Sequence, residues 1–346
     1  MKLSMPIGYS GNVKQTIDEV VAFEDAGVDL VWVAEAYGMD AATAMGYIAA
    51  KTHRVEIASG ILPIYTRTPT LLAMTAVGVD VLSEGRCVLG LGASGPQVIE
   101  GWHGVAYDKP LGRTREIVEI CREIWAREAK LEHAGPNYQI PLPADQGTGL
   151  GKSLKIITYP PRPQIPIFLA SLGPKNVELT AEIADGWLPT LFVPERASAV
   201  WGDDLARGYA ARDASLGKMD IIAGGLLAIG DEAEVAKYRD YGRASTALYV
   251  GGMGAVGKNF YNSLFSRYGW ESEAHQLQEL YLSGRKAEAE AAVPADFLEA
   301  SSLVGDESYI KDRLAAYEEA GVTYLNVSPV GPDPVGTVRK LRELMG

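Results

Sequence analysis

The stretch EIASGILPIYTRTPT, residues 56–70, begins as a short apolar strand, breaks at Ser59 and Gly60, and enters a helix at Thr68 and Pro69. Threonine followed by proline predicts a helix start, because proline lacks only an N–H group that the first turn would leave unpaired. Glycine at a strand end lets a flat ligand approach the bare backbone. Parallel α/β proteins place their chemistry at such turns, although a glycine that merely makes the turn is the simpler interpretation.

The composition restricts the class of protein. The chain has 346 residues, 47% of them hydrophobic, and no apolar run of about 18 residues that would predict a membrane span. Its net charge of −12 disfavours nucleic acid and anionic membranes as partners. The two cysteines, Cys87 and Cys121, and four scattered histidines lack metal-ligand spacing, so we expect no metal site. The N-terminus leads into a strand rather than a secretion signal, which predicts a cytoplasmic protein.

Strand and helix patterns alternate along the chain. We predict strands over residues 3–9, 28–33, 54–58, 87–91, 167–170, 186–190, 221–229 and 322–327, and helices over 13–26, 41–51, 69–82, 114–128, 177–184, 194–211 and 334–345. This alternation predicts right-handed βαβ units and a parallel sheet. Eight strands predict an α/β fold, the (β/α)8 TIM barrel, as a single domain over residues 1–346. A typical barrel has about 250 residues, so we expect insertions at about 131–166 and 231–310, with residues 231–320 mostly helical.

The fourth predicted strand ends in GLGASG, residues 90–95, which fits the pattern G-x-G-x-x-G. A dinucleotide site needs glycines that open a helix and an acidic residue at the end of a second strand about 20 residues later. That position lies in the predicted helix over 114–128, so we do not expect a Rossmann site. The nucleophile-elbow pattern is also missed, because Pro96 stands where its last glycine belongs.

In a TIM barrel the loops after the strand carboxyl ends form the functional face. Here those loops hold glycine, aromatic and small polar residues, with no Ser/His/Asp constellation and no carboxylate pair on one strand. Such a set suits an enzyme whose cofactor carries the chemistry. The candidates in the first four loops are Glu35, Tyr37, Asp40, Gly60, Ile61, Tyr65, Ser94, Gly95, Trp102 and His103.

The segment SLGPKN is the best candidate for an anion site. It comprises Ser171, Leu172, Gly173, Pro174, Lys175 and Asn176. Gly173 exposes backbone N–H groups, and the positive end of the following helix points at this loop beside Lys175. An ordinary turn with a solvated lysine is the alternative interpretation.

Two further basic residues are candidates for binding anions. Lys152 ends the stretch GTGLGK, residues 147–152, which is equally consistent with a flexible surface loop. Arg113 is placed to bind a second anionic group, or else to pair with Glu116 or Glu119 on the same helix.

Two residues are candidates for acid–base catalysis. Glu35 lies at a strand end, where a carboxylate is costly unless it is paired or used. His103 is a candidate proton donor, although a lone loop histidine is more often structural.

Several stretches resemble the luciferase-like monooxygenase superfamily, and within it the F420-dependent oxidoreductases that include methylenetetrahydromethanopterin reductase. They are SGILPIYTRTPTLLAMT (59–75), LGLGASGPQV (89–98), GWHG (101–104), KPLGRTRE (109–116), GTGLGK (147–152) and LASLGPKNVELT (169–180). The likeness covers residues 1–215 well, the last 25 residues moderately and residues 231–310 poorly.

The resemblance implies a TIM barrel that binds the deazaflavin F420 at its carboxyl-end face. A bulge with a non-proline cis peptide, by position Gly60–Ile61, would back the cofactor ring. The phosphate of F420 would lie at residues 173–176 and its polyglutamate tail near Lys152 and Arg113. The implied cofactor contacts also include Ser59, Ser94, Gly95, Ser171 and Leu172, and the implied substrate pocket holds Tyr37, Asp40, Tyr65 and Trp102.

The resemblance further implies hydride transfer between C5 of the deazaflavin and an organic substrate, and a homodimer. Two differences from other members of the superfamily restrict the substrates that the resemblance implies. Sugar-phosphate dehydrogenases of the superfamily carry Asp-His where this chain has Glu35-Ala36, and methanopterin reductases carry an acidic residue where it has residues 6–9, PIGY. Two alternatives stay open: an FMN-dependent monooxygenase on the same barrel, and a non-catalytic protein that binds F420 or flavin.

Overall fold

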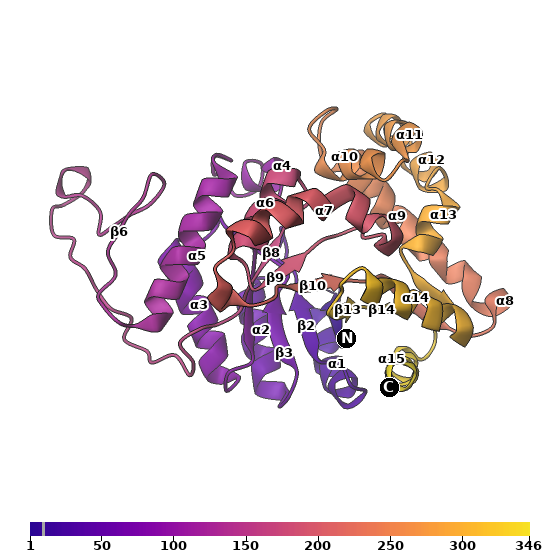
Figure 1. Cartoon of the computed structure of the whole chain (residues 1–346), viewed down its shortest axis with the longest axis horizontal. Coiled ribbons are helices and arrows are strands. Elements are labelled where there is room, and N and C mark those ends of the chain that lie inside the picture. Colours follow the sequence, from indigo (N-terminus) through magenta and orange to yellow (C-terminus); the bar gives the residue numbers. More distant parts are fainter. Residues whose placement is uncertain (9–10) are drawn as a thin grey trace.

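A closed ring of parallel strands forms the centre of the molecule (Figure 1). The computed structural model describes residues 1–8 and 11–346, and Tyr9, the predicted end of the first strand, lies outside them. Each strand of the ring pairs in parallel with the next, and the last pairs with the first, which confirms the predicted TIM barrel. In chain order the ring comprises β1 (Lys2–Ile7), β2 (Leu30–Val33), β3 (Glu56–Ser59), β5 (Cys87–Gly92), β8 (Ile167–Ala170), β9 (Gly186–Leu188), β10 (Asp220–Ala223) and β13 (Tyr324–Asn326).

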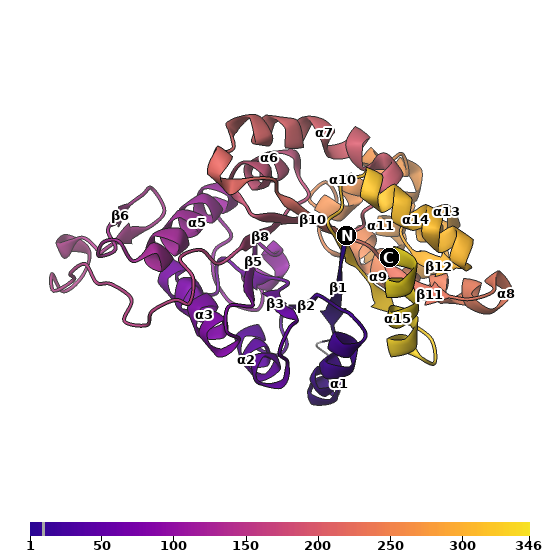
Figure 2. The same ribbon diagram turned by 60° about the horizontal axis from the view of Figure 1, so that its bottom comes forward.

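Helices cover the outside of this ring (Figure 2). They are α1 (Val13–Asp25), α2 (Ala41–Lys51), α3 (Pro69–Leu82), α5 (Pro110–Ala126), α6 (Pro174–Ile183), α7 (Pro194–Ala211), α14 (Glu307–Glu319) and α15 (Pro334–Met345), with the short α4 (Pro96–Ile99) after β5. The predicted start of α3 is confirmed, since Thr68 Oγ1 accepts a hydrogen bond from the N–H of Leu71 at 3.2 Å and Pro69 occupies the first turn. This cap directs the chain from β3 into its helix and so shapes the loop between them.

The even-numbered residues of the ring strands point into the barrel, as an interior cluster of Leu30, Trp32, Ala58, Val88, Phe168, Ile222 and Tyr324 shows. Because the strands are tilted, inward residues of alternate strands form layers of four. The strand register places Ser4, Ala58, Phe168 and Ile222 in the middle layer, where each is at most 2% exposed. The barrel is therefore packed solid at mid-height.

The prediction of one continuous strand over residues 221–229 is wrong. The chain breaks at Gly224 and Gly225 into β10 and β11 (Leu226–Ile229), and β11 pairs with β12 (Leu303–Gly305) and β14 (Ser328–Pro329) outside the ring. An ideal Cβ on Gly224 would lie 2.1 Å from the carbonyl oxygen of Asn326, and one on Gly225 would lie 1.9 Å from that of Ser301. Only glycine permits this approach of neighbouring backbones, and β12 was missed within the predicted helical stretch.

Two long segments lie beside the barrel. Residues 127–166, with β6 (His133–Ala134), β7 (Gln139–Ile140) and η1 (Ala144–Gln146), project away from it at the left of Figure 1. Glu116 of α5 anchors this projection, because its carboxylate accepts hydrogen bonds from the backbone N–H groups of Asn137 and Tyr138 and contacts His133 Nε2 at 3.1 Å.

The second segment is a group of short helices between β11 and β12, on the opposite side in Figure 1. They are α8 (Glu232–Val235), η3 (Ala236–Tyr241), α9 (Gly242–Ala247), the π-helical η4 (Leu248–Gly252), α10 (Phe260–Arg267), α11 (Glu271–Leu282), α12 (Lys286–Ala291) and α13 (Ala295–Ala300). Over residues 1–8 and 11–346, no helix has the length and apolar character needed to cross a bilayer.

Candidate functional site

At the carboxyl end of the barrel two layers of inward positions lie above the packed middle, and we call the region that they border the bowl. The layer above the packed middle forms its floor (Trp32, Gly90, Leu188 and Asn326), and the next layer forms its wall (Pro6, Gly60, Ala170 and Gly224). All four wall residues are reached by solvent. Barrel interiors are ordinarily filled by bulky side chains. Because the wall consists of glycine, alanine and proline, it leaves room for a flat ligand above the floor.

The backbone at Gly60 forms one side of the bowl. β3 ends at Ser59, and the peptide bond between Gly60 and Ile61 is cis, as the resemblance implied. An ideal Cβ on Gly60 would lie 3.2 Å from Cβ of Trp32, and one on Gly92 would lie 3.1 Å from Cγ1 of Ile61. This turn is therefore fitted closely between the floor and β5, and a side chain at either glycine would displace its neighbours.

The other predicted cofactor contacts at this side, Ser59, Ser94 and Gly95, differ in whether a ligand can reach them. Ser59 is fully buried, and its Oγ donates to the carbonyl oxygen of Gly90 at 2.8 Å and accepts from its N–H at 2.9 Å. Its hydroxyl is thus used within the barrel wall. Ser94, with φ of 58°, and Gly95, the N-cap residue of α4, are partly exposed where β5 ends.

Glu35 forms an ion pair with Arg67 that is nearly buried. The two Arg67 nitrogens lie 2.5 and 2.9 Å from the two carboxylate oxygens, and the side chains of Arg67 and Glu35 are only 11% and 9% exposed. The carboxylate also accepts from the N–H of Ala41 at 2.9 Å. Both oxygens of Glu35 are therefore committed to holding the loop after β2 against the loop after β3.

Asp40 belongs to the same group, because its Oδ1 lies 2.5 Å from Arg67. Burial alone would raise the pKa of the Asp40 carboxyl, but hydrogen bonds from Thr43 and the charge of Arg67 outweigh it and lower the pKa. The charges of Glu35, Asp40 and Arg67 thus sum to one negative charge, and Arg67 is not free to bind an anionic ligand.

Aromatic side chains surround the same end of the barrel. The rings of Tyr37 and Trp102 lie 6.2 Å apart, and each side chain is 66% exposed. Tyr65 packs on Tyr107 at 5.1 Å and donates its hydroxyl proton to the carbonyl oxygen of Asp108 at 2.9 Å. Burial raises the pKa of Tyr65, so it stays a neutral donor.

His103 follows Trp102 in the loop between α4 and α5. Its side chain is partly exposed, but its Nε2 atom is enclosed and has no hydrogen-bond partner among the described residues. Enclosed polar atoms are nearly always paired, so this nitrogen, unlike the Glu35 carboxylate, keeps hydrogen-bonding capacity that the described residues leave unused.

Comparison with known proteins identifies the family. The family model described as luciferase-like monooxygenase matches residues 2–324. The chain belongs to the luciferase-like monooxygenase family. A Mycobacterium tuberculosis protein provisionally named coenzyme F420-dependent oxidoreductase is 41% identical, over 99% of this chain and 98% of its own length. The 5,10-methylenetetrahydromethanopterin reductase of Archaeoglobus fulgidus is 26% identical over 90% of this chain and 88% of its own length.

A solved structure also shares the fold. The coenzyme F420-dependent tetrahydromethanopterin reductase of Methanopyrus kandleri matches with a TM-score of 0.77 at 22% identity, covering 98% of this chain and 96% of that one. The resemblance recognised in the sequence is therefore confirmed at the level of family and fold.

In this luciferase-like chain the predicted anion segment is rigidly held. The carbonyl oxygens of Ser171 and Leu172 each accept an indole N–H at 3.0 Å, from Trp187 and Trp201 respectively. The Ser171 hydroxyl is buried against Thr180 Oγ1 at 2.8 Å and is not available to a ligand.

The first turn of α6 is more open. Gly173 is its N-cap residue, and the N–H groups of Gly173 and Lys175 find no acceptor in the described part of the chain. The exposed ammonium of Lys175 has no ion-pair partner there either, and the Asn176 side chain is partly exposed beside it. These groups are suited to binding an anion.

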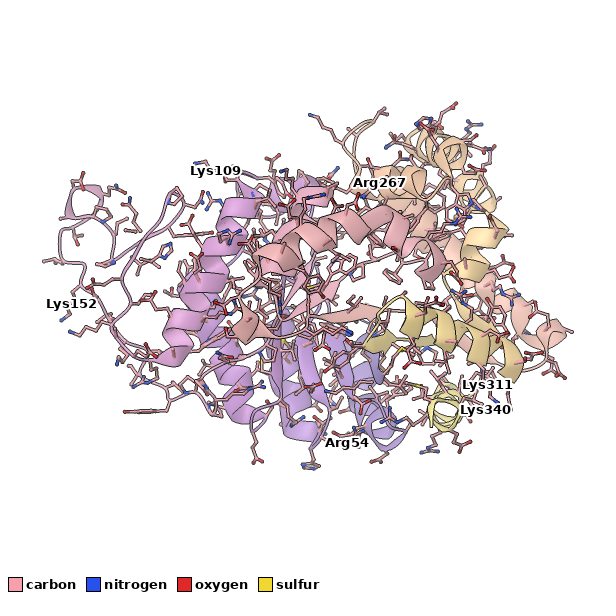
Figure 3. All side chains as sticks on the ribbon, in the orientation of Figure 1. Arg54, Lys109, Lys152, Arg267, Lys311 and Lys340 are labelled. Atoms are coloured by element: carbon pink, nitrogen blue, oxygen red, sulfur yellow. The ribbon has the colours of Figure 1, made fainter. Side chains whose placement is uncertain are left out.

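The other two predicted basic residues are separated by the structure. Arg113 pairs with Asp108 at 2.9 Å, rather than with Glu116 or Glu119, and its guanidinium lies 5.8 Å from the Tyr65 ring centre, which places it at the mouth. Lys152 is exposed on the projecting segment, away from the barrel (Figure 3).

Sequence reasoning overlooked the floor of the bowl. Trp32 and Asn326 lie within strands, whereas the predicted site residues were sought in loops. The signal was present, because inward positions follow the two-residue period of each strand, and the small residues Gly60, Ala170 and Gly224 succeed larger ones along their strands.

A hollow of about 570 Å³ lies at the opposite, amino end of the barrel, lined in part by Lys2, Asp220 and Tyr324. It contains no predicted site residue. Its charged inward side chains distinguish it from the bowl.

Proposed function

We propose that this protein is an F420-dependent oxidoreductase that passes a hydride between the cofactor and an organic substrate. The observation that carries the proposal is the 41% identity, over 99% of the chain, to a relative provisionally named as such an enzyme. The bowl supports it, because a ring of small inward residues gives a planar cofactor access to bare backbone.

The residues present fit a flat ring with an anionic arm. Gly60, Ile61, Ser94 and Gly95 would contact the ring in the bowl, and the first turn of α6 with Lys175 would hold the phosphate. When bound, F420 supplies the hydride from C5 of its deazaflavin ring. The chain's own task is to orient the ring, exclude water and hold or move a proton.

The two acid–base candidates, Glu35 and His103, would have different roles. Glu35, paired to Arg67 and to the N–H of Ala41, would fix the shape of the mouth. His103, whose Nε2 has no partner among the described residues, would exchange a proton with the substrate. The exposed rings of Tyr37 and Trp102 would contact the substrate, as would Tyr65 and Asp40.

A cofactor titration tests the proposal. The purified protein is titrated separately with F420 and with FMN, and binding is followed by quenching of tryptophan fluorescence. We expect saturable binding of F420 and, with reduced F420, turnover on part of a carbonyl, enone and imine panel. Binding of FMN alone would favour the monooxygenase alternative, and F420 binding without any turnover would favour a non-catalytic carrier.

We further propose a homodimer that pairs through α3. Four large apolar side chains share the outer face of this helix at helical spacing: Leu71, Met74, Val81 and Leu82, which are 44%, 55%, 40% and 66% exposed. The only charged residue of α3, Asp80, is fully buried. On a chain with net charge −12, this uncharged face allows a second copy to approach without repulsion.

Light scattering tests this pairing. Met74→Glu places a charge on the face, and its matching copy would carry another, so we expect the variant to be monomeric and the wild type dimeric. Glu343→Met, on the outer helix α15, is the control and should leave the mass unchanged. A monomeric wild type, or a dimeric Met74→Glu variant, would refute it.

A further inference from the structure

The floor of the bowl contains a side-chain amide, Asn326, that none of the roles above uses. It is partly exposed, whereas the middle-layer residues beneath it are at most 2% exposed, so solvent reaches Asn326 from the bowl. Gly224 lies directly against its backbone, where an ideal Cβ would come within 2.1 Å of the Asn326 carbonyl oxygen. The amide therefore faces whatever occupies the bowl.

A buried hydroxyl fixes this amide. Ser4, which is 0% exposed, donates from Oγ to Oδ1 of Asn326 at 3.2 Å. With Oδ1 engaged, Nδ2 keeps two N–H donors for which the described residues supply no acceptor. The floor also holds a second donor that the described residues leave unpaired, the enclosed indole N–H of Trp32, a residue only 4% exposed. Unpaired donors of this kind are costly until a ligand satisfies them.

The N–H donors of Asn326 and Trp32 are suited to a neutral hydrogen-bond acceptor. The nearest inward charges are Lys2, Glu56 and Asp220, which lie below the packed middle layer, and Lys2 and Glu56 pair with each other at 3.3 Å. No charge of the barrel interior therefore competes for the ligand at floor level, and an amide N–H suits a carbonyl oxygen.

We propose that Asn326 donates a hydrogen bond from Nδ2 to a carbonyl oxygen at the pyrimidinedione end of the ring cofactor, and that Ser4 is a positioning residue for this amide. The inference rests on the proposed function, because it takes a deazaflavin or flavin ring in the bowl as given. Both kinds of ring carry the same pair of carbonyl groups, so the chemistry recognised is common to F420 and FMN.

Binding and spectra of four variants test it. Whichever of F420 and FMN the wild type binds is titrated into Asn326→Ala, Asn326→Asp, Ser4→Ala and the Ser4→Ala/Asn326→Ala double variant. Loss of one neutral hydrogen bond predicts about threefold to tenfold weaker binding for Asn326→Ala, with the absorption maximum of the bound ring shifted toward that of the free cofactor. Asn326→Asp keeps the shape and the acceptor for Ser4 but opposes a carbonyl with a carboxylate, so its loss should be larger.

The double variant identifies the role of Ser4. If Ser4 acts through Asn326, Ser4→Ala weakens binding by less than Asn326→Ala, and adding it to Asn326→Ala changes nothing further. Lys175→Ala is the matched control, expected to weaken binding through the anionic arm without moving the absorption maximum. Thermal melting confirms that each variant is folded.

The outcomes separate the two proposals. A wild type that binds cofactor, with Asn326→Ala and Asn326→Asp unchanged in affinity and spectrum, overturns this inference and leaves the proposed function standing. Additive losses in the double variant overturn the role of Ser4. A wild type that binds neither F420 nor FMN overturns both.

Discussion

The two ends of this barrel are built from the same alternation of inward residues and have opposite character. At the amino end the inward side chains are large or charged and satisfy one another. The Tyr324 hydroxyl donates to Glu56 at 2.8 Å and accepts from Lys2 at 2.8 Å, while Lys2 also contacts Glu56 at 3.3 Å. At the carboxyl end the wall residues Pro6, Gly60, Ala170 and Gly224 have no polar side-chain group to pair.

This difference shows how one scaffold separates stability from binding. A closed ring needs something inside it, and the packed middle layer with the hydrogen-bonded side chains beneath it supplies that packing. The carboxyl end is then free to accommodate a ligand. We therefore expect substitutions at the bowl to affect binding first, and substitutions at the amino end to affect stability first.

The largest expected effect comes from filling the bowl. Ala170→Phe projects a ring from the wall into the space above the floor, so F420 affinity should fall by two orders of magnitude or more, about 3 kcal/mol. Because Ala170 is already reached by solvent, the melting temperature should change little. Fluorescence titration and thermal melting measure the two quantities.

The control for this variant is Ala199→Phe, which makes the same change on the exposed face of α7. It should leave both affinity and melting temperature as in the wild type. Tight F420 binding by Ala170→Phe would mean that the ring does not occupy the bowl.

The next largest effect is expected at the amino end of the barrel. Tyr324→Phe removes the hydroxyl that joins Lys2 to Glu56, and the loss of these hydrogen bonds should lower the free energy of unfolding by about 1–3 kcal/mol. Cofactor affinity should be unchanged. Urea denaturation measures the loss, with Tyr159→Phe, at a side chain 78% exposed, as the neutral control. Weakened binding at unchanged stability would contradict the division between the two ends.

Much of the scaffold behind this comparison could be predicted from local signals. The predicted bounds of α2, α3, α7 and α15 coincide with the structure, because caps and prolines mark helix starts without reference to the rest of the chain. The break at Gly224 and Gly225 could not be found this way. It depends on close approach to Asn326 and Ser301, residues distant in sequence.

The site was predictable in part for the same reason. The turn at Gly60 follows from a strand end, a glycine and a helix cap, all local. The pairing of Glu35 with Arg67, and the position of Lys152 on a projecting segment, depend on how separate loops come together. Asn326 depends on barrel closure, since the pairing of β1 with β13 brings Ser4 opposite it.

A smaller effect concerns the edge of the bowl rather than its interior. Lys175→Ala removes a free ammonium at the first turn of α6, and should weaken F420 binding several-fold, about 1 kcal/mol, without changing stability. Lys311→Ala, on α14 away from the mouth, is the control (Figure 3). The affinity of the wild type should fall with added salt more steeply than that of Lys175→Ala. Equal affinity in both lysine variants would place the phosphate elsewhere.

The smallest expected effect tests whether the charges at the amino end of the barrel fully compensate one another. Burial raises the pKa of Asp220, a hydrogen bond from Thr323 and the positive charge of Lys2 oppose the rise, and the negative charge of Glu56 adds to it. The folded state therefore holds the Asp220 proton more tightly than the unfolded state. Its contribution to stability is present below the ordinary pKa of 3.8 and is lost as pH rises through the raised value.

Asp220→Asn resembles the protonated form at every pH. Its melting temperature should match that of the wild type near pH 3 and exceed it slightly near pH 7, by melting measurements across about pH 3–8. A variant less stable than the wild type at neutral pH would mean that Lys2 needs this carboxylate as a partner, and that the amino end is a balanced charge network. The expected gain would instead show that the amino end of the barrel keeps one partly buried charge at a cost to stability, even though Lys2, Glu56 and Tyr324 pair with one another there.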